Sequence, residues 1–373
     1  MKLGLGLKPH LWTAERLKLT RQLGCESVVA WVPLPEGDGI WHLDDLLRLR
    51  EDADRAGLEF STIENFHPGH WDHIVLGEPG KERQIDNLCQ TLTNAARAGI
   101  RHWGYSFSVC GVQGYYTEHN NTAGRGLSSI KCFDTGRLPP DWTPPPNREF
   151  WFNTTLERRP ATGTIPPVGE QEMWERFHWF LEKILPVAEE AGIRLCAHPD
   201  DPPVPVLRGM ARPLCNLEGH RKLLSLVDSP CNCLEFCQGT VSTMPGVDIY
   251  EAIREFASGG KIGYVHFRNT SGTLPAYSEV FIDDGYVDMR KALRLYQECG
   301  FDGLLIPDHT PIVSSDAPWD TGMAFALGFM RGACSGKHPA KPDSGHSTCR
   351  QSRLLTEHEI SQHPFLCALG ESS

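Results

Sequence analysis

One arrangement of hydrophobic and polar positions recurs along the chain. A stretch with helical spacing ends at a glycine, and a short apolar run follows at once. The arrangement occurs in QLGCESVVAWV (22–32), RAGLEFSTIE (55–64), RAGIRHWGYSFS (97–108), EAGIRLCAHP (190–199) and ECGFDGLLIPD (298–308). A glycine just past a helix can adopt the left-handed conformation that closes it. Each segment therefore predicts a helix followed directly by a strand.

The stretches before these glycines carry apolar residues at intervals of three and four. Thr13 is a predicted helix cap ahead of Leu17 and Leu23. The same spacing occurs at Leu43, Leu46, Leu47 and Ala53, at Ile85, Leu88, Leu92 and Ala96, and at Met173, Phe177, Phe180, Leu181, Ile184 and Ala188. Apolar runs at 3–7, 232–239 and 261–267 bring the predicted strands to eight. Eight alternating strands and helices predict an α/β fold, a (β/α)8 TIM barrel, with a doubly wound open sheet as the alternative.

One interval and the end of the chain depart from this pattern. The segment at about 111–170 is rich in Gly, Pro, Asn and Thr, and it predicts a long βα loop insertion. Such loops lie over the catalytic face of a barrel. The periodic pattern stops near Gly332. We therefore expect one barrel domain at 1–333 and a poorly ordered tail at 334–373.

Composition and charge exclude several classes of protein. With 40% hydrophobic and 22% charged residues the chain is globular, and its net charge of −11 argues against binding to a phosphate backbone. No apolar run approaches the roughly 20 residues that span a bilayer. The first residues, MKLGLGLKPHLW, lack the apolar core and cleavage site of a signal peptide. We expect a cytoplasmic protein with neither nucleic acid nor membrane as a partner.

The 13 cysteines do not form a recognisable disulfide or zinc-finger pattern. Their number is odd, and no Cys-x-x-Cys pair occurs. Cys196 and Cys233 lie in apolar runs, which is typical of small buried residues. Most of the cysteines are therefore expected to be reduced and structural.

Four consecutive predicted strands end in a residue type that binds metal ions: His198, Cys237, His266 and Asp308. Their separations of 39, 29 and 42 residues are each close to one βα unit, so the side chains would meet at the carboxyl-terminal rim. Imidazole, thiolate and carboxylate together suit Mn, Fe, Co or Zn. A single such residue is more often buried and structural, but four in register favour a metal site.

The segments around these positions form a distinctive set: AHPDDPP (197–203), EFCQGT (235–240), VHFRN (265–269), DDGYVDM (283–289) and GFDGLLIPDHTP (300–311). TIENFHPGHWDHIVLG (62–77) and a GRG and CFD pair (124–134) precede them. Over about residues 1–333 the chain resembles the mannonate dehydratase family of the xylose-isomerase-like barrel superfamily.

The resemblance implies a lyase of hexuronate catabolism that dehydrates D-mannonate to 2-dehydro-3-deoxy-D-gluconate. It also implies a divalent metal, Mn²⁺ or Fe²⁺, held by His198, Cys237, His266 and Asp308, which are the positions that the strand spacing selects. The expected partner is a small-molecule sugar acid, and we expect a homo-oligomer. The alternative functions are a sugar isomerase or epimerase of the same superfamily and a barrel that binds a sugar acid without turnover.

Dehydration requires a base, an acid and positive charge near the substrate. His309 is the first candidate for proton transfer because histidine titrates near neutral pH; orienting a metal ligand is its alternative role. Arg268 lies two residues after His266 and is a candidate clamp for the substrate carboxylate. Its alternative is a salt bridge to Asp200 or Asp201.

Further candidates for substrate binding stand at strand ends and on the insertion. Glu64 and Asn65 end the strand LEFSTIEN, and Asn269 ends the HFRN segment. Arg125 lies on the insertion, where a solvated loop arginine is the alternative. Asp200 is either a substrate ligand or a support for a metal ligand.

In one respect the chain departs from the family that it resembles. The resemblance implies a proton-transferring tyrosine shortly after the histidine of the PDH segment. This chain has no tyrosine after Tyr296, and Met323 stands where the hydroxyl is expected. Either Asp320 or Tyr105 takes the role, or the activity or substrate differs.

Overall fold

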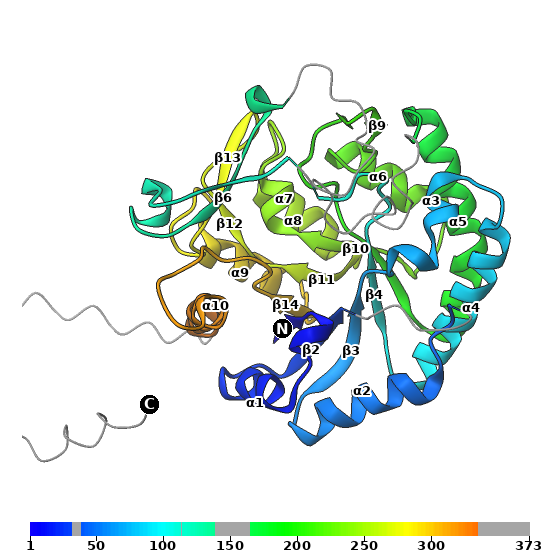
Figure 1. Ribbon diagram of the computed structural model, residues 1–373, viewed down its shortest axis with the longest axis horizontal. Coiled ribbons are helices and arrows are strands. Elements are labelled where there is room, and N and C mark those ends of the chain that lie inside the picture. Colours follow the sequence, from blue (N-terminus) through cyan, green and yellow to red (C-terminus); the bar gives the residue numbers. More distant parts are fainter. Residues whose placement is uncertain (32–38, 113, 139–164, 335–373) are drawn as a thin grey trace, which may run out of the picture. The chain divides into compact units, whose positions relative to one another are not determined.

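Eight parallel strands close into a barrel that helices surround (Figure 1). The computed structural model describes residues 1–31, 39–112, 114–138 and 165–334. Around the barrel the order is β1-β14-β11-β10-β7-β4-β3-β2. Their bounds are β1 (Lys2–Leu7), β2 (Ser27–Trp31), β3 (Glu59–Glu64), β4 (His102–Tyr105), β7 (Arg194–Ala197), β10 (Asn232–Cys237), β11 (Ile262–His266) and β14 (Leu304–Ile306). All eight predicted strands are confirmed, and the sheet is closed rather than open.

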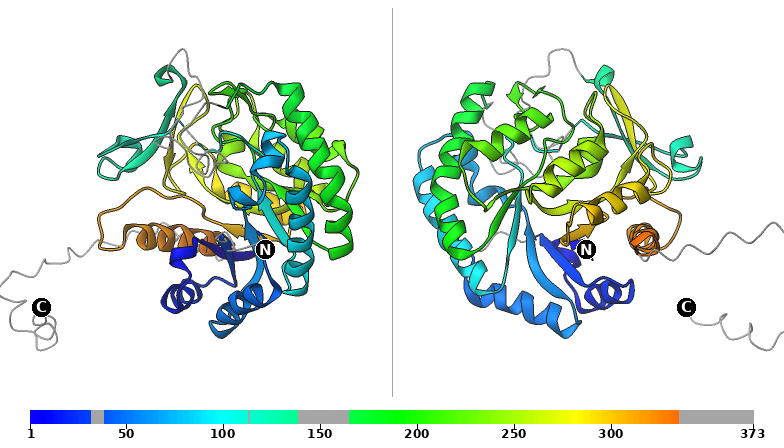
Figure 2. Two further views of the ribbon diagram at one scale, coloured as in Figure 1. Left: turned by 45° about the vertical axis from the view of Figure 1, so that its right-hand side comes forward. Right: turned by 180° about the vertical axis from the view of Figure 1, so that it is seen from behind.

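The predicted helices alternate with these strands and form the outer ring (Figure 2). Thr13 caps the first helix, because its hydroxyl accepts a hydrogen bond from the Arg16 backbone N–H at 3.2 Å. The longer helices are α1 (Ala14–Gln22), α2 (Leu43–Arg55), α4 (Lys81–Arg97), α5 (Glu170–Ala191), α6 (Leu217–Leu226), α8 (Ile249–Ser258), α9 (Met289–Glu298) and α10 (Pro318–Cys334). Two short helices, α3 (Asp72–Leu76) and α7 (Gln238–Ser242), precede α4 and α8.

The apolar face of α5 packs on the barrel wall. The six apolar residues predicted for this face are all buried. Phe177 stacks on Phe107 with ring centroids 4.3 Å apart, and Phe180 lies 5.5 Å from the ring of Tyr105. Tyr105 is fully buried in this aromatic layer. Its side chain therefore belongs to the core, which disagrees with the alternative that Tyr105 transfers protons.

The inside of the barrel changes from apolar to polar along its strands. Below the carboxyl end of the strands, the interior holds a small apolar cluster: Val29, Cys196, Cys233, Tyr264, Leu304 and Ile306. This burial agrees with the expectation for Cys196 and Cys233. Because side chains alternate along a strand, the inward residue two positions after Cys196 is His198, and the one after Tyr264 is His266. The carboxyl end of the barrel is therefore lined by polar groups.

A second sheet, which the sequence did not predict, lies beside the barrel mouth. It has the order β12-β13-β6-β5 and is antiparallel. β5 (Tyr116–Glu118) and β6 (Ile130–Asp134) come from the insertion, and β12 (Asn269–Thr270) and β13 (Ala276–Val280) follow β11. Part of the predicted loop is thus strand. The partner of β6 is β13, which is far away in the sequence, so no local pattern could indicate the pairing.

The described residues belong to one compact unit, Met1–Ser335. The predicted tail at 334–373 lies almost entirely outside the described residues, and so does the middle of the insertion at 139–164. Within the described part of the chain, no helix is both long and apolar enough to cross a membrane.

The close packing of the barrel interior predicts that Gly104 of β4 cannot be enlarged. A Cβ at this position would overlap with the Tyr264 hydroxyl and a carboxylate oxygen of Glu235. We expect Gly104→Ala to lower the free energy of unfolding by about 1–3 kcal/mol in urea denaturation followed by circular dichroism.

Gly328→Ala is the matched control. Gly328 is exposed on α10, and nothing lies within 4 Å of an added Cβ. Alanine in a helix should raise the free energy of unfolding by about 0.5–1 kcal/mol. If the Gly104→Ala protein is as stable as the unchanged protein, the tight interior is contradicted.

Candidate active site

Three metal-binding residue types meet at the carboxyl end of the barrel. His198 directly follows β7, Cys237 ends β10 and His266 ends β11. The register of the two last strands places Cys237 beside His266. One ligand atom from each residue lies within 4.8 Å of the other two. The structure therefore brings together three of the four predicted metal ligands.

Asp308 lies next to this group. It follows β14 by two residues and has a left-handed backbone conformation, with φ of 62°. Its Oδ2 is 3.4 Å from His266 Nδ1 and accepts a hydrogen bond from Arg268 Nε at 2.9 Å. Burial would raise the pKa of Asp308, but the charges of His309, His266 and Arg268 hold it well below its usual value. Asp308 is thus an ionised neighbour of the group, and its role as fourth ligand stays a prediction.

The ring of His198 has a defined orientation. Its Nδ1 lies 2.6 Å from the backbone carbonyl oxygen of Pro199. A carbonyl can only accept, so Nδ1 carries the proton and Nε2 keeps its lone pair. That lone pair is the one available to a metal ion.

Two buried glutamates that sequence reasoning missed as a pair lie against His266. Glu235 Oε1 is 2.9 Å and Glu64 Oε2 is 3.4 Å from His266 Nε2. Glu64 was predicted as a substrate ligand, whereas Glu235 was not singled out. A signal for Glu235 existed, because it stands two residues before Cys237 in an apolar run and alternation places both on one face.

These carboxylates create a strongly negative environment. Burial lowers the pKa of His198, but Glu235 and Cys237 outweigh it and raise the value to about 9. The pKa of His266 is also raised, because Asp308, Glu235 and Glu64 overcome the effect of burial. Surroundings that favour the protonated form of an imidazole also favour a metal cation in place of that proton.

The surroundings of Cys237 favour its thiolate form. Burial raises the pKa of its thiol, but the charges of Arg268 and His198 lower it to about 5. Neither nitrogen of His266 forms a hydrogen bond with a described residue. Two imidazoles and a thiolate are donors that divalent transition metals prefer. The residues therefore fit the predicted metal ion.

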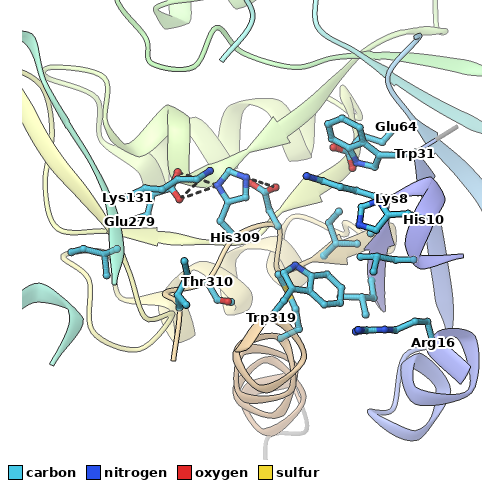
Figure 3. Close-up of a pocket in the computed structure, with 18 of the residues that line it drawn as sticks. Lys8, His10, Arg16, Trp31, Glu64, Lys131, Glu279, His309, Thr310 and Trp319 are labelled. Atoms are coloured by element: carbon cyan, nitrogen blue, oxygen red, sulfur yellow. Dashed lines mark hydrogen bonds and ion pairs between the residues drawn. The ribbon is translucent and has the colours of Figure 1, made fainter. Parts of the chain in front are cut away.

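A cavity of about 560 Å³ opens beside this group (Figure 3). Glu64 and Asp308 line it and also contact His266. The rest of its wall combines charged and apolar side chains, among them Lys8, Trp31, Lys131, Glu279, His309, Trp319 and Met323. A small polar molecule in this cavity would lie next to the metal-binding residue types.

His309 stands on the cavity wall and is held by Glu279 of β13. Its Nδ1 is 3.0 Å from both carboxylate oxygens of Glu279, and its Nε2 is 3.4 Å from Asp308 Oδ1. Burial would raise the pKa of Glu279, but His309, Lys131 and Arg268 lower it to about 2. Sequence reasoning missed Glu279, because the β13 segment carries no sign of its proximity to the barrel.

Arg268 is buried and paired with acidic side chains. It is 3% exposed and does not appear among the described residues that line the cavity. Besides Asp308, its guanidinium donates to Asp201 at 2.9 Å and to Thr240 at 3.0 Å. The structure thus has the salt bridge that was the alternative for Arg268, with Asp201 as the partner, and a role as a carboxylate clamp stays a prediction.

Of three predicted substrate ligands, Asp200 and Asn269 have side chains bonded to the backbone, whereas for Asn65 the bonded group is its own backbone N–H. Asp200 accepts a hydrogen bond from the Leu214 N–H at 2.8 Å. The Asn269 amide donates to the carbonyls of Ile282 and Val287 at 3.1 and 3.0 Å. The Asn65 N–H donates to the Gly104 carbonyl at 2.8 Å. Of the described residues that line the cavity, none is Asp200, Asn269 or Asn65.

Two further candidates are committed to ion pairs. Arg125 is 43% exposed, pairs with Asp283 and Asp284, and covers the ring of Phe281 at 4.2 Å. Asp320 of α10 pairs with Arg16. Neither is found among the described cavity residues, whereas Met323 is. The position expected to carry a hydroxyl is therefore apolar, and a catalytic role for Asp320 stays a prediction.

Comparison with known proteins identifies the family. The family model for D-mannonate dehydratase (UxuA) matches residues 12–332. A mannonate dehydratase of Thermotoga petrophila is 30% identical over 320 residues, which cover 80% of this chain and 86% of that protein.

Solved structures share the fold at lower identity. The crystal structure of mannonate dehydratase from Streptococcus suis serotype 2 has a TM-score of 0.72 and 22% identity, covering 94% of this chain and 99% of that one. D-psicose 3-epimerase has a TM-score of 0.56 and 14% identity, covering 90% and 100%. Because the family model spans most of the sequence, the chain belongs to the D-mannonate dehydratase family, whose members are hydro-lyases.

Proposed function

We propose that this protein removes water from D-mannonate to give 2-dehydro-3-deoxy-D-gluconate, with Mn²⁺ or Fe²⁺ bound at the barrel mouth. One observation carries the proposal: His198, Cys237 and His266 converge beside a cavity whose wall presents His309. Family membership supports the same reaction.

The metal would be held by His198, Cys237 and His266, with Asp308 as the fourth ligand. When bound, a divalent metal polarises substrate oxygens and stabilises the negative charge that develops as a proton leaves carbon. Glu235 contacts His266 and holds its ring, as carboxylates beside metal-binding histidines do. Arg268 keeps Asp308 in place.

His309 is the proposed proton-transfer group. In the reaction, the carbon next to the carboxylate loses a proton, and the following carbon loses its hydroxyl, which leaves as water once protonated. The resulting enol becomes the ketone by moving a proton from oxygen to carbon. With Nδ1 held by Glu279, Nε2 of His309 can take the first proton and return it to the leaving hydroxyl. One residue can thereby act as base and acid, although Met323 supplies no hydroxyl.

The reaction itself is tested with purified protein loaded with stoichiometric Mn²⁺ or Fe²⁺. We expect D-mannonate to yield a 2-keto-3-deoxy acid that mass spectrometry finds lighter by one water, and we expect turnover to stop when a chelator removes the metal. A product of unchanged mass would indicate an isomerase or epimerase. Binding without any product would indicate a non-catalytic barrel, and either result contradicts the proposal.

The metal assignment predicts that two buried cysteines respond differently to removal of the thiol. Loss of a group that supports a metal ligand weakens metal binding by roughly 10- to 100-fold. Cys237→Ala removes the proposed ligand itself, so it should weaken Mn²⁺ binding by more than this. Cys196→Ala, in the apolar cluster two residues before His198, should leave Mn²⁺ affinity unchanged. Calorimetric titration of the metal-free proteins measures both. Equal affinities in the two variants would exclude Cys237 as a ligand.

The assignment of His309 predicts a loss of turnover without loss of metal. His309→Asn should lower kcat by roughly 10²- to 10⁴-fold, because no group then moves the proton. Glu279→Gln, which preserves shape but removes the charge beside Nδ1, should lower kcat less. Mn²⁺ affinity should stay constant in both variants. If His309→Asn instead weakens Mn²⁺ binding and kcat of the metal-saturated variant is normal, His309 only orients a ligand.

A further inference from the structure

Two lysines reach the cavity from different parts of the fold. Lys8 directly follows β1, and Lys131 lies in β6 of the second sheet. Both line the cavity, and Figure 3 shows them on either side of His309. The barrel and the second sheet therefore each contribute one ammonium group to the same space.

Each lysine lies beside another residue of the cavity wall. Lys8 Nζ is 5.9 Å from the ring centroid of Trp31, another residue of the cavity wall. Lys131 Nζ is 3.9 Å from Glu279 Oε2, and this carboxylate also accepts from His309 Nδ1. Burial and the charge of Lys131 lower the pKa of Lys8, whereas the carboxylates of Glu64 and Asp308 raise it.

Other cations near the site have different partners. Arg16 is the remaining lysine or arginine among the described cavity residues, and it pairs with Asp320. The arginines expected from the sequence to hold a carboxylate, Arg125 and Arg268, pair with aspartates elsewhere. The described lining contains three such cations and three carboxylates: Lys8, Arg16 and Lys131 against Glu64, Glu279 and Asp308.

We propose that Lys8 and Lys131 form the subsite for the substrate carboxylate. This inference rests on the proposed function and deepens it, since it restricts the substrate to open-chain sugar acids and excludes neutral sugars. An ammonium group donates charge-assisted hydrogen bonds to a carboxylate, and two such groups that face one cavity can each bind one of its oxygens. Trp31, Trp319 and Met323 reduce the access of water, which strengthens these interactions.

The test compares a charged with a neutral ligand in Mn²⁺-loaded protein. Lys8→Met and Lys131→Met should each raise KM for D-mannonate at least about tenfold, with a smaller change in kcat, because a charged hydrogen bond is lost. The Kd of the probe D-gluconate should rise in parallel. Weak binding of D-mannitol, which has no carboxylate, should not change. Lys8→Arg and Lys131→Arg should restore most of the affinity for D-gluconate.

Lys18→Met is the matched control. Lys18 is exposed on α1 and is not among the described cavity residues, so its loss should leave KM and both Kd values unchanged. Circular dichroism and thermal unfolding verify that each variant is folded, as expected for lysines outside the core.

The outcomes separate this inference from the proposed function. If D-mannonate is dehydrated and neither Lys→Met variant changes KM or the Kd of D-gluconate, the lysine subsite is overturned and the proposed function stands. If the unchanged protein does not dehydrate D-mannonate, and the Lys→Met variants bind D-gluconate more weakly than it does, the proposed function fails and the lysine subsite stands. Equal loss of D-gluconate and D-mannitol binding in the Lys→Met variants would also overturn the lysine subsite.

Discussion

The narrow interior of the closed barrel is the constraint on which the site depends. Inward side chains of neighbouring strands must share a small space, and alternation decides which ones they are. Below the carboxyl end of the strands the inward side chains are apolar. At the carboxyl end they are His198, Cys237 and His266, with Glu235 against His266. Titratable groups so close together and so buried must neutralise one another. The negative carboxylates, the thiolate and the imidazoles do this only in part, which makes the place suited to a cation.

Arg268 connects this interior to Asp308, the proposed fourth ligand. Its guanidinium joins Asp201 and Asp308 and lowers the pKa of Cys237. A residue in this position acts on the site through its electrostatic effect on Asp308 and Cys237. A buried guanidinium in contact with several acidic groups is itself stabilised by them, so its location and its role have the same electrostatic cause.

The second sheet completes the wall of the cavity next to His309. β13 brings Glu279 to His309, and β6 brings Lys131 beside Glu279. Proton transfer and recognition of the substrate carboxylate, as proposed, both depend on strands outside the barrel. The barrel therefore determines where the metal would bind, whereas the added sheet determines what can be bound and turned over next to it.

The sequence by itself determined the eight strands, the outer helices and the convergence of three metal-binding residue types. These follow from local periodicity, because the spacing of glycines, apolar residues and strand ends is read within one βα unit. Only the tertiary structure decided the roles of Arg268, Arg125 and Asp320, and only it revealed Lys131 and Glu279 as neighbours of His309. An ion pair depends on which charged groups lie within a few ångströms, and these partners come from segments far apart in the chain. The pairing of β6 with β13 is the clearest example, since two short strands separated by more than a hundred residues leave no trace of their contact in either segment.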